Sequence, residues 1–123
     1  MKVQRFQDLI AWQKARVFVR AVYALTVVEP FSRDFGLKNQ IQRAVVSIMS
    51  NIAEGFERNR LSEFHQFLSV AKSSCAETRS LLYVALDVGY VAEPVFQVTL
   101  DQGDEVGRII GGLRASIQRE MDA

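Results

Sequence analysis

The amino-acid sequence predicts an all-α protein, folded as a single up-down-up-down antiparallel four-helix bundle that takes in residues 1–123. Apolar residues recur every three or four positions in four segments, which is the spacing of one face of a helix. The two prolines, Pro30 and Pro94, lie where this spacing is interrupted. No segment alternates apolar and polar residues for long enough to indicate a β-strand. Because the connections between the four segments are short, neighbouring helices are expected to run antiparallel.

The first helix is expected from about Asp8 to Val28, with Asp8 as its N-cap. Its apolar stripe consists of Leu9, Trp12, Ala15, Val19, Val22 and Thr26, joined by Ala11, Phe18 and Leu25. The segment from Pro30 to Gly36 breaks the helical period, so it is expected to connect the first helix to the second.

The second helix, from about Leu37 to Arg58, carries three stripes of side chains where a surface helix needs only two. The core stripe is Ile41, Val45, Ile48, Ile52 and Phe56, and the polar stripe is Gln40, Arg43, Ser47, Asn51, Glu54 and Arg58. The third stripe is again apolar and consists of Val46, Met49 and Ala53. This extra stripe predicts a helix that is covered on more than one side, and its residues are the candidate interface for self-association.

The third helix is expected to begin near Ser62 and to end at Gly89, and Pro94 is expected to open the fourth. The core stripe of the third helix is Phe64, Phe67, Leu68, Ala71, Cys75, Thr78, Leu82, Ala85 and Leu86. Cys75, the only cysteine of the chain, is expected to be a small buried hydrophobe. The fourth helix repeats glycine every four residues, at Gly103, Gly107 and Gly111, with Gly112 beside the last. The repeat indicates either a close approach by another helix or a weak C-terminal helix that frays.

A polar seam is predicted between the second and third helices. If they form a hairpin that turns near residue 60, Arg43 lies opposite Glu77, and Ser47 meets Ser73 or Ser74. Apolar neighbours should partly shield Glu77 from water, so an ion pair with Arg43 is expected. The predicted seam consists of Gln40, Arg43, Ser47, Asn51, Glu54, Ser74 and Glu77. A ligand or nucleic-acid site is the alternative interpretation of the same residues.

Charge is distributed unevenly, although the net charge is only +1. Residues 1–60 hold ten basic and five acidic residues, whereas residues 61–123 hold five basic and nine acidic residues. The basic half predicts either contact with a polyanion or an attraction between copies of the chain, and simple solvation is the third interpretation. The candidate nucleic-acid contacts are Lys14, Arg16, Arg20, Lys38, Arg58 and Arg60. Such contacts would bind phosphates without reading base sequence.

Enzymatic activity is the function that the sequence favours least. The single histidine, His65, lies ten residues before Cys75, or about 15 Å along a helix, so the two cannot form a nucleophile–base pair. No glutamate has a histidine three residues later, as the metal sites of helix bundles require, and no glycine-rich phosphate loop is present. The first residues match neither a signal peptide nor a membrane span, so a cytoplasmic location is expected.

Three motifs follow one another along residues 6–90: Phe6-Gln-Asp-Leu-Ile-Ala-Trp-Gln-Lys-Ala15, Gln40-Ile-Gln-Arg-Ala…Ser47-Ile…Asn51-Ile-Ala-Glu-Gly55, and Glu63-Phe…Phe67-Leu…Ala71…Ser74…Glu77. Together they resemble the bacterial four-helix-bundle family encoded by intervening sequences of large-subunit ribosomal RNA genes. More distantly, they resemble the accessory proteins of diversity-generating retroelements. The resemblance implies a cytoplasmic bundle that assembles into a ring, commonly a homopentamer, with nucleic-acid binding proposed for some members. Arg60 departs from the family, which often has a small polar residue there.

These observations favour a non-enzymatic, self-assembling scaffold or adaptor as the function. The expected partner is another copy of the chain. Weak, sequence-nonspecific binding of RNA or DNA through the first two helices is the alternative. No cofactor, metal, membrane or small-molecule partner is expected.

Overall fold

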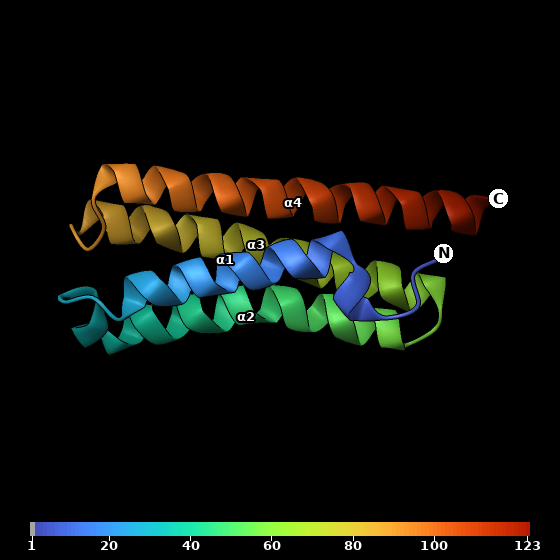
Figure 1. Cartoon of the computed structure of the whole chain (residues 1–123), viewed down its shortest axis with the longest axis horizontal. Coiled ribbons are helices and arrows are strands. Elements are labelled where there is room, and N and C mark those ends of the chain that lie inside the picture. Colours follow the sequence, from blue (N-terminus) through green and yellow to red (C-terminus); the bar gives the residue numbers. More distant parts are fainter. Residues whose placement is uncertain (1) are drawn as a thin grey trace.

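Four α-helices make up nearly all of the structure, a computed structural model that describes residues 2–123. They are α1 (Ile10–Thr26), α2 (Phe35–Glu57), α3 (Leu61–Asp87) and α4 (Glu93–Asp122), with short 3-10 turns η1 (Phe6–Asp8) and η2 (Phe31–Arg33). Successive helices alternate in direction, so that both termini lie at one end of the bundle (Figure 1). No strand is present within residues 2–123. The prediction of an all-α four-helix bundle is confirmed.

Each helix packs against the helices before and after it, and α4 returns to pack against α1. The bundle therefore has four outer grooves, which we name by their helices: α1/α2, α2/α3, α3/α4 and α1/α4. The pair α2 and α3 makes the most extensive contact, and the pair α1 and α4 the least extensive of the four. The α2/α3 and α1/α4 grooves consequently lie on opposite sides of the molecule.

The predicted apolar stripes converge on one core along the bundle axis. Its largest fully buried side chains include Phe18, Phe31, Ile41, Ile48, Ile52, Leu68, Leu82, Ile110 and Ile117. Cys75 is also fully buried, as predicted, and its Sγ donates to the carbonyl oxygen of Gly103 at 3.2 Å. Burial raises the pKa of the Cys75 thiol, so the neutral form is favoured.

Helix ends agree with the sequence at some positions and not at others. Gly89 follows α3 with a φ of +82°, a conformation that glycine adopts without strain, as predicted for the end of this helix. The prediction that Asp8 caps the first helix is wrong, because Leu9 holds the N-cap position and Asp8 belongs to η1. At the start of α2, the Asp34 carboxylate accepts the backbone N–H of Leu37 at 3.1 Å. Asp34 also accepts the Tyr90 hydroxyl at 2.8 Å, which joins the two loops at this end of the bundle.

Glycine permits close helix approach at two positions in the bundle. A Cβ on Gly55 of α2 would lie 2.5 Å from the Cβ of Phe67 on α3, and a Cβ on Gly103 of α4 would lie 2.7 Å from Cζ of Phe18 on α1. Gly107 would meet only ordinary van der Waals contacts. The predicted glycine repeat therefore marks a close approach at its first member, while α4 continues as a helix to Asp122.

Candidate functional site

The α2/α3 groove holds a short chain of hydrogen bonds between half-buried side chains. Ser47 Oγ and Ser74 Oγ lie 2.9 Å apart, and Ser74 is one of the two partners that the hairpin register predicted. Asn51 Nδ2 donates to the carbonyl oxygen of Ser47 at 2.8 Å and to its Oγ at 2.9 Å. The Ser47–Ser74 pair joins the two helices, and Asn51 holds the Ser47 hydroxyl from its own helix.

The expected ion pair between Arg43 and Glu77 is wrong. Both side chains line one hollow of about 420 Å³, but Glu77 accepts a hydrogen bond from Gln40 Nε2 at 3.4 Å. Within residues 2–123, Arg43 makes no ion pair. Glu77 is exposed, not partly buried as predicted, so water solvates its charge and removes the need for a cationic partner. Glu54 does not join the seam and lines a separate hollow with Phe6 and the end of α2.

The candidate self-association stripe of α2 is half-buried within the chain itself. Val46 and Met49 pack against the core, and Ala53 is half-buried close to them. The reason is that α1 covers this side of α2 while α3 covers the other. A helix with two neighbours needs a wider apolar arc than a helix with one, and the role of this stripe as an interface between copies stays a prediction.

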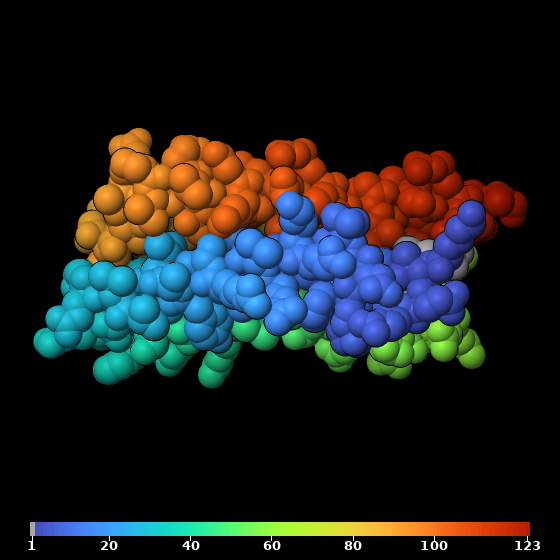
Figure 2. Space-filling view, viewed as in Figure 1, coloured from blue at the N-terminus to red at the C-terminus, as the bar shows by residue number. Residues whose placement is uncertain are grey.

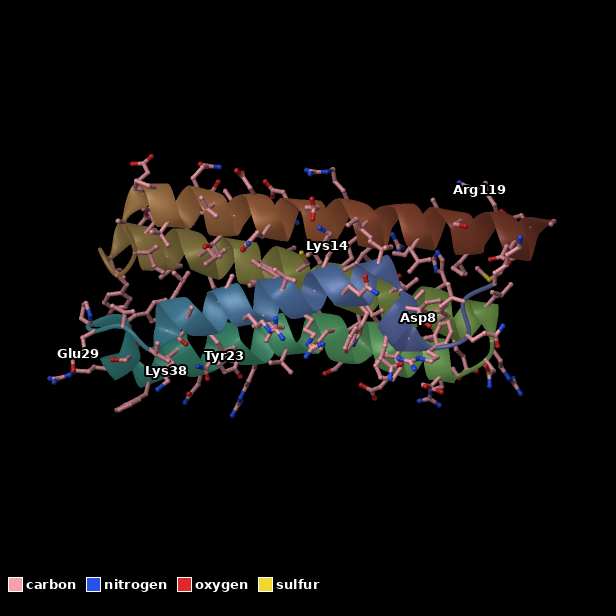
Figure 3. All side chains as sticks on the ribbon, in the orientation of Figure 1. Asp8, Lys14, Tyr23, Glu29, Lys38 and Arg119 are labelled. Carbon is pink, nitrogen blue, oxygen red and sulfur yellow. The ribbon has the colours of Figure 1, made fainter. Side chains whose placement is uncertain are left out.

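The candidate nucleic-acid contacts do not gather on one surface. Lys14 points from the middle of α1 toward α4, whereas Lys38 lies near the bundle end that holds Glu29 (Figure 3). Glu105 pairs with Lys14 at 3.2 Å, and Glu63 lies within ion-pair distance of both Arg58 and Arg60. Arg16 and Lys38 lie over aromatic rings. Among residues 2–123, no carboxylate pairs with Arg16, Arg20 or Lys38.

A comparison with protein-family models found a match over residues 7–112 to the family described as 23S rRNA-intervening sequence protein. This chain belongs to that family. A crystal structure at 1.70 Å of a protein with unknown function from the S23 ribosomal protein family of Bacteroides thetaiotaomicron VPI-5482 has the same fold, with a TM-score of 0.79. The two sequences are 20% identical, and the similarity covers 86% of this chain and 96% of the Bacteroides chain. A search of curated proteins found no match.

In this intervening-sequence protein, exposed apolar side chains occur on both helices that border the α1/α4 groove, and we refer to four of them together as the α1/α4 band. Figure 2 shows the surfaces of α1 and α4 meeting on one face of the molecule. The band consists of Ile10, Val17, Val95 and Val98, whose exposed fractions are 58%, 47%, 47% and 61%. The Lys14–Glu105 ion pair sets the register across the groove, so Val17 lies level with Gln102, whose Oε1 is enclosed and without a hydrogen-bond partner among residues 2–123.

Sequence reasoning missed this band because its members fall outside the core stripes. One signal was present: Ile10 and Val17 are seven residues apart, on the face of α1 that points away from the core. The described residues contain no group of histidine, cysteine and acidic side chains able to hold a metal ion. In the same part of the chain, no helix is both long enough and apolar enough to cross a membrane.

Proposed function

We propose that this intervening-sequence protein is a non-enzymatic cytoplasmic scaffold that assembles from copies of the same chain. The observation that supports this most is the α1/α4 band of Ile10, Val17, Val95 and Val98, each about half exposed or more. Exposed apolar side chains on two neighbouring helices can mark an interaction site, because covering them removes apolar area from water. The family resemblance, with its ring-shaped homopentamer, supports a second copy as the occupant.

Charge complementarity supports the same occupant. Residues 1–60 carry an excess of five positive charges and residues 61–123 an excess of four negative charges. A head-to-tail contact brings the first half of one copy beside the second half of the next, and such a contact closes into a ring when the rotation allows. In this proposal apolar area supplies the affinity, and charge supplies the orientation.

The test is light scattering of the wild-type chain and of Val98→Glu at micromolar concentration. We expect a ring-sized oligomer for the wild type and a helical monomer for Val98→Glu, because a buried unpaired carboxylate is costly in the interface but harmless in water. Val70→Glu is the matched control, since Val70 is 49% exposed on α3. A wild-type chain that is monomeric, or equal dissociation by both variants, would remove this proposal.

A second candidate function is weak nucleic-acid binding through α1. The observation that favours it is that Arg16 and Arg20 lie one turn apart and have no carboxylate partner among residues 2–123. Binding of labelled RNA at about 50 mM salt, lost in the double variant Arg16→Glu/Arg20→Glu, is its test.

A further inference from the structure

The second half of the chain is acidic overall, yet three of its five basic residues meet in one place. Lys72 and Arg79 on α3 and Arg114 on α4 line a hollow of about 360 Å³ in the α3/α4 groove, together with Ser69, Ser73 and Ala76. The sequence did not reveal this cluster, because its members lie far apart in the chain and on two helices. The register of α3 against α4 brings them together.

One glycine of α4 makes room for these cations. Lys72 Nζ lies 3.2 Å from the position that a Cβ on Gly111 would occupy, so a side chain there would crowd the ammonium group. Arg79 Nη2 lies 3.8 Å from the corresponding position on Gly107, which is an ordinary van der Waals distance.

Positive charge in the groove exceeds negative charge. Arg79 Nη1 lies 3.2 Å from Asp104 Oδ1, the one carboxylate paired with these cations in the part of the chain described, and Lys72 has no ion-pair partner there. Arg79 Nε is enclosed and lacks a hydrogen-bond acceptor among residues 2–123. Arg114 Nε donates to Ser69 Oγ at 3.1 Å, and that hydroxyl donates to the His65 carbonyl, which holds the guanidinium at the groove. The surplus amounts to two positive charges.

We propose that the α3/α4 groove binds the phosphate group of a small phosphorylated ligand. A phosphate offers several acceptor oxygens and close to two negative charges, which match three cations, the Ser73 hydroxyl and one compensating carboxylate. A carboxylate ligand would balance only half of the surplus. Beyond Asp104 the edge-on contact of the Tyr83 and Phe96 rings, with centroids 4.9 Å apart, interrupts the basic surface. A compact ligand fits this limited site better than a nucleic-acid strand, which needs a continuing row of cations.

Calorimetric titration with inorganic pyrophosphate at about 50 mM salt tests the proposal. We expect saturable binding at one site per chain, and a loss of at least about tenfold in affinity for Lys72→Gln/Arg114→Gln, because two charged hydrogen bonds are removed. Arg108→Gln is the matched control: Arg108 is exposed on α4 and does not line the groove. Its effect should stay within about twofold, the size of a general change in charge.

A second variant, Ser73→Glu, tests the same site without depending on whether Lys72→Gln/Arg114→Gln folds stably. Ser73 is exposed, so Ser73→Glu introduces a carboxylate into the groove without a packing cost and should also prevent pyrophosphate binding. Absence of saturable binding by the wild-type chain, or equal weakening by Arg108→Gln, would overturn the proposal. So would binding of a single-stranded oligonucleotide without any response to pyrophosphate, since the phosphate would then belong to a nucleic-acid backbone. None of these outcomes depends on self-assembly through the α1/α4 band.

Discussion

The α2/α3 and α1/α4 grooves lie on opposite sides of the bundle and differ in which side chains they leave exposed. In the α2/α3 groove, Ser47 and Ser74 bond to each other and Gly55 admits the Phe67 side chain, so its half-buried hydroxyl groups are paired and its helices approach closely. In the α1/α4 groove, Val17 and Val98 are left in water, although Gly103 admits Phe18 beneath them. The first groove has a hydrogen bond between its helices, whereas the second leaves apolar side chains exposed, and this second groove is the surface of the proposed self-association.

The extent of contact between the helices also differs, because α2 and α3 pack most extensively, and α1 and α4 least extensively, of the four neighbouring pairs. Burial of apolar area contributes about 25 cal/mol per Å², so covering the exposed side chains of a groove would stabilise an association there. Covering a polar groove whose buried atoms are already paired would yield little of this free energy.

The largest expected effect comes from closing the space that glycine leaves between helices. Gly55→Ala should lower the free energy of unfolding by about 1–2 kcal/mol, because its Cβ would meet the Cβ of Phe67, which cannot move without its backbone. Gly103→Ala should cost less, since the nearest atom is the far end of the Phe18 ring. Urea titrations at one protein concentration measure both.

Gly112→Ala is the control for these substitutions. No atom outside its own helix segment lies within 4 Å of its Cβ position, so the change should raise stability by about 1 kcal/mol through helix propensity. If Gly55→Ala were equally stabilising, the close approach of α2 to α3 at this position would not require glycine.

An intermediate effect is expected from the seam hydrogen bond. Ser47→Ala and Ser74→Ala should each cost about 1 kcal/mol, and the double variant less than their sum, because each single change leaves a half-buried hydroxyl without its partner. The equivalent cycle on Lys14 and Glu105 should give a coupling below about 0.5 kcal/mol, since both side chains are about half exposed. Additive losses for the two serines would mean that the seam does not couple the helices.

The smallest expected effect is a pH dependence at the loop end of the bundle. The Leu37 N–H and the Tyr90 hydroxyl lower the pKa of Asp34, so its ionised form stabilises the fold above the unfolded-state pKa. That contribution should be lost as the pH falls below about 4. The same hydrogen bond raises the pKa of Tyr90, so its contribution should persist through pH 10 and then be lost as the pH rises.

The measurement for this prediction compares urea midpoints across pH for the wild type and Tyr90→Phe. In Tyr90→Phe the urea midpoint should change less with pH, in both the acid and the alkaline range. Tyr83→Phe is the control, because the Tyr83 hydroxyl has no hydrogen-bond partner among residues 2–123. A variant Tyr90→Phe with the pH profile of the wild type would show that the Asp34–Tyr90 hydrogen bond is not maintained in solution.

Most of the fold could be predicted because its signals are local. Apolar spacing located all four helices, and Gly89 and Pro94 marked a true end and a true start. Asp8 was misassigned because the Phe6 ring packs on Trp12, with centroids 5.2 Å apart, and the chain makes a 3-10 turn before α1. That contact links residues on either side of Asp8, and cap propensity alone does not include it.

The candidate sites were less predictable, because they depend on what covers each face. Val46 and Met49 have the pattern of an interface, but the same pattern is required when α1 of the same chain is the covering element. The hairpin register placed Ser47 near Ser74, yet it could not tell that Glu77 would remain in water. Lys72 and Arg114 become neighbours only through the register of α3 against α4, which depends on the whole core.

Cys75 can serve as a native probe of local opening in the bundle. Its thiol is fully buried beside Gly103, where α4 approaches the rest of the bundle, and it is the only cysteine in the sequence. A thiol reagent can reach it only after the bundle opens locally, so the labelling rate reports how often that opening occurs. If contact with another copy restrains this opening, the labelling rate should fall as the fraction of assembled chains rises. The measurement needs no engineered tag.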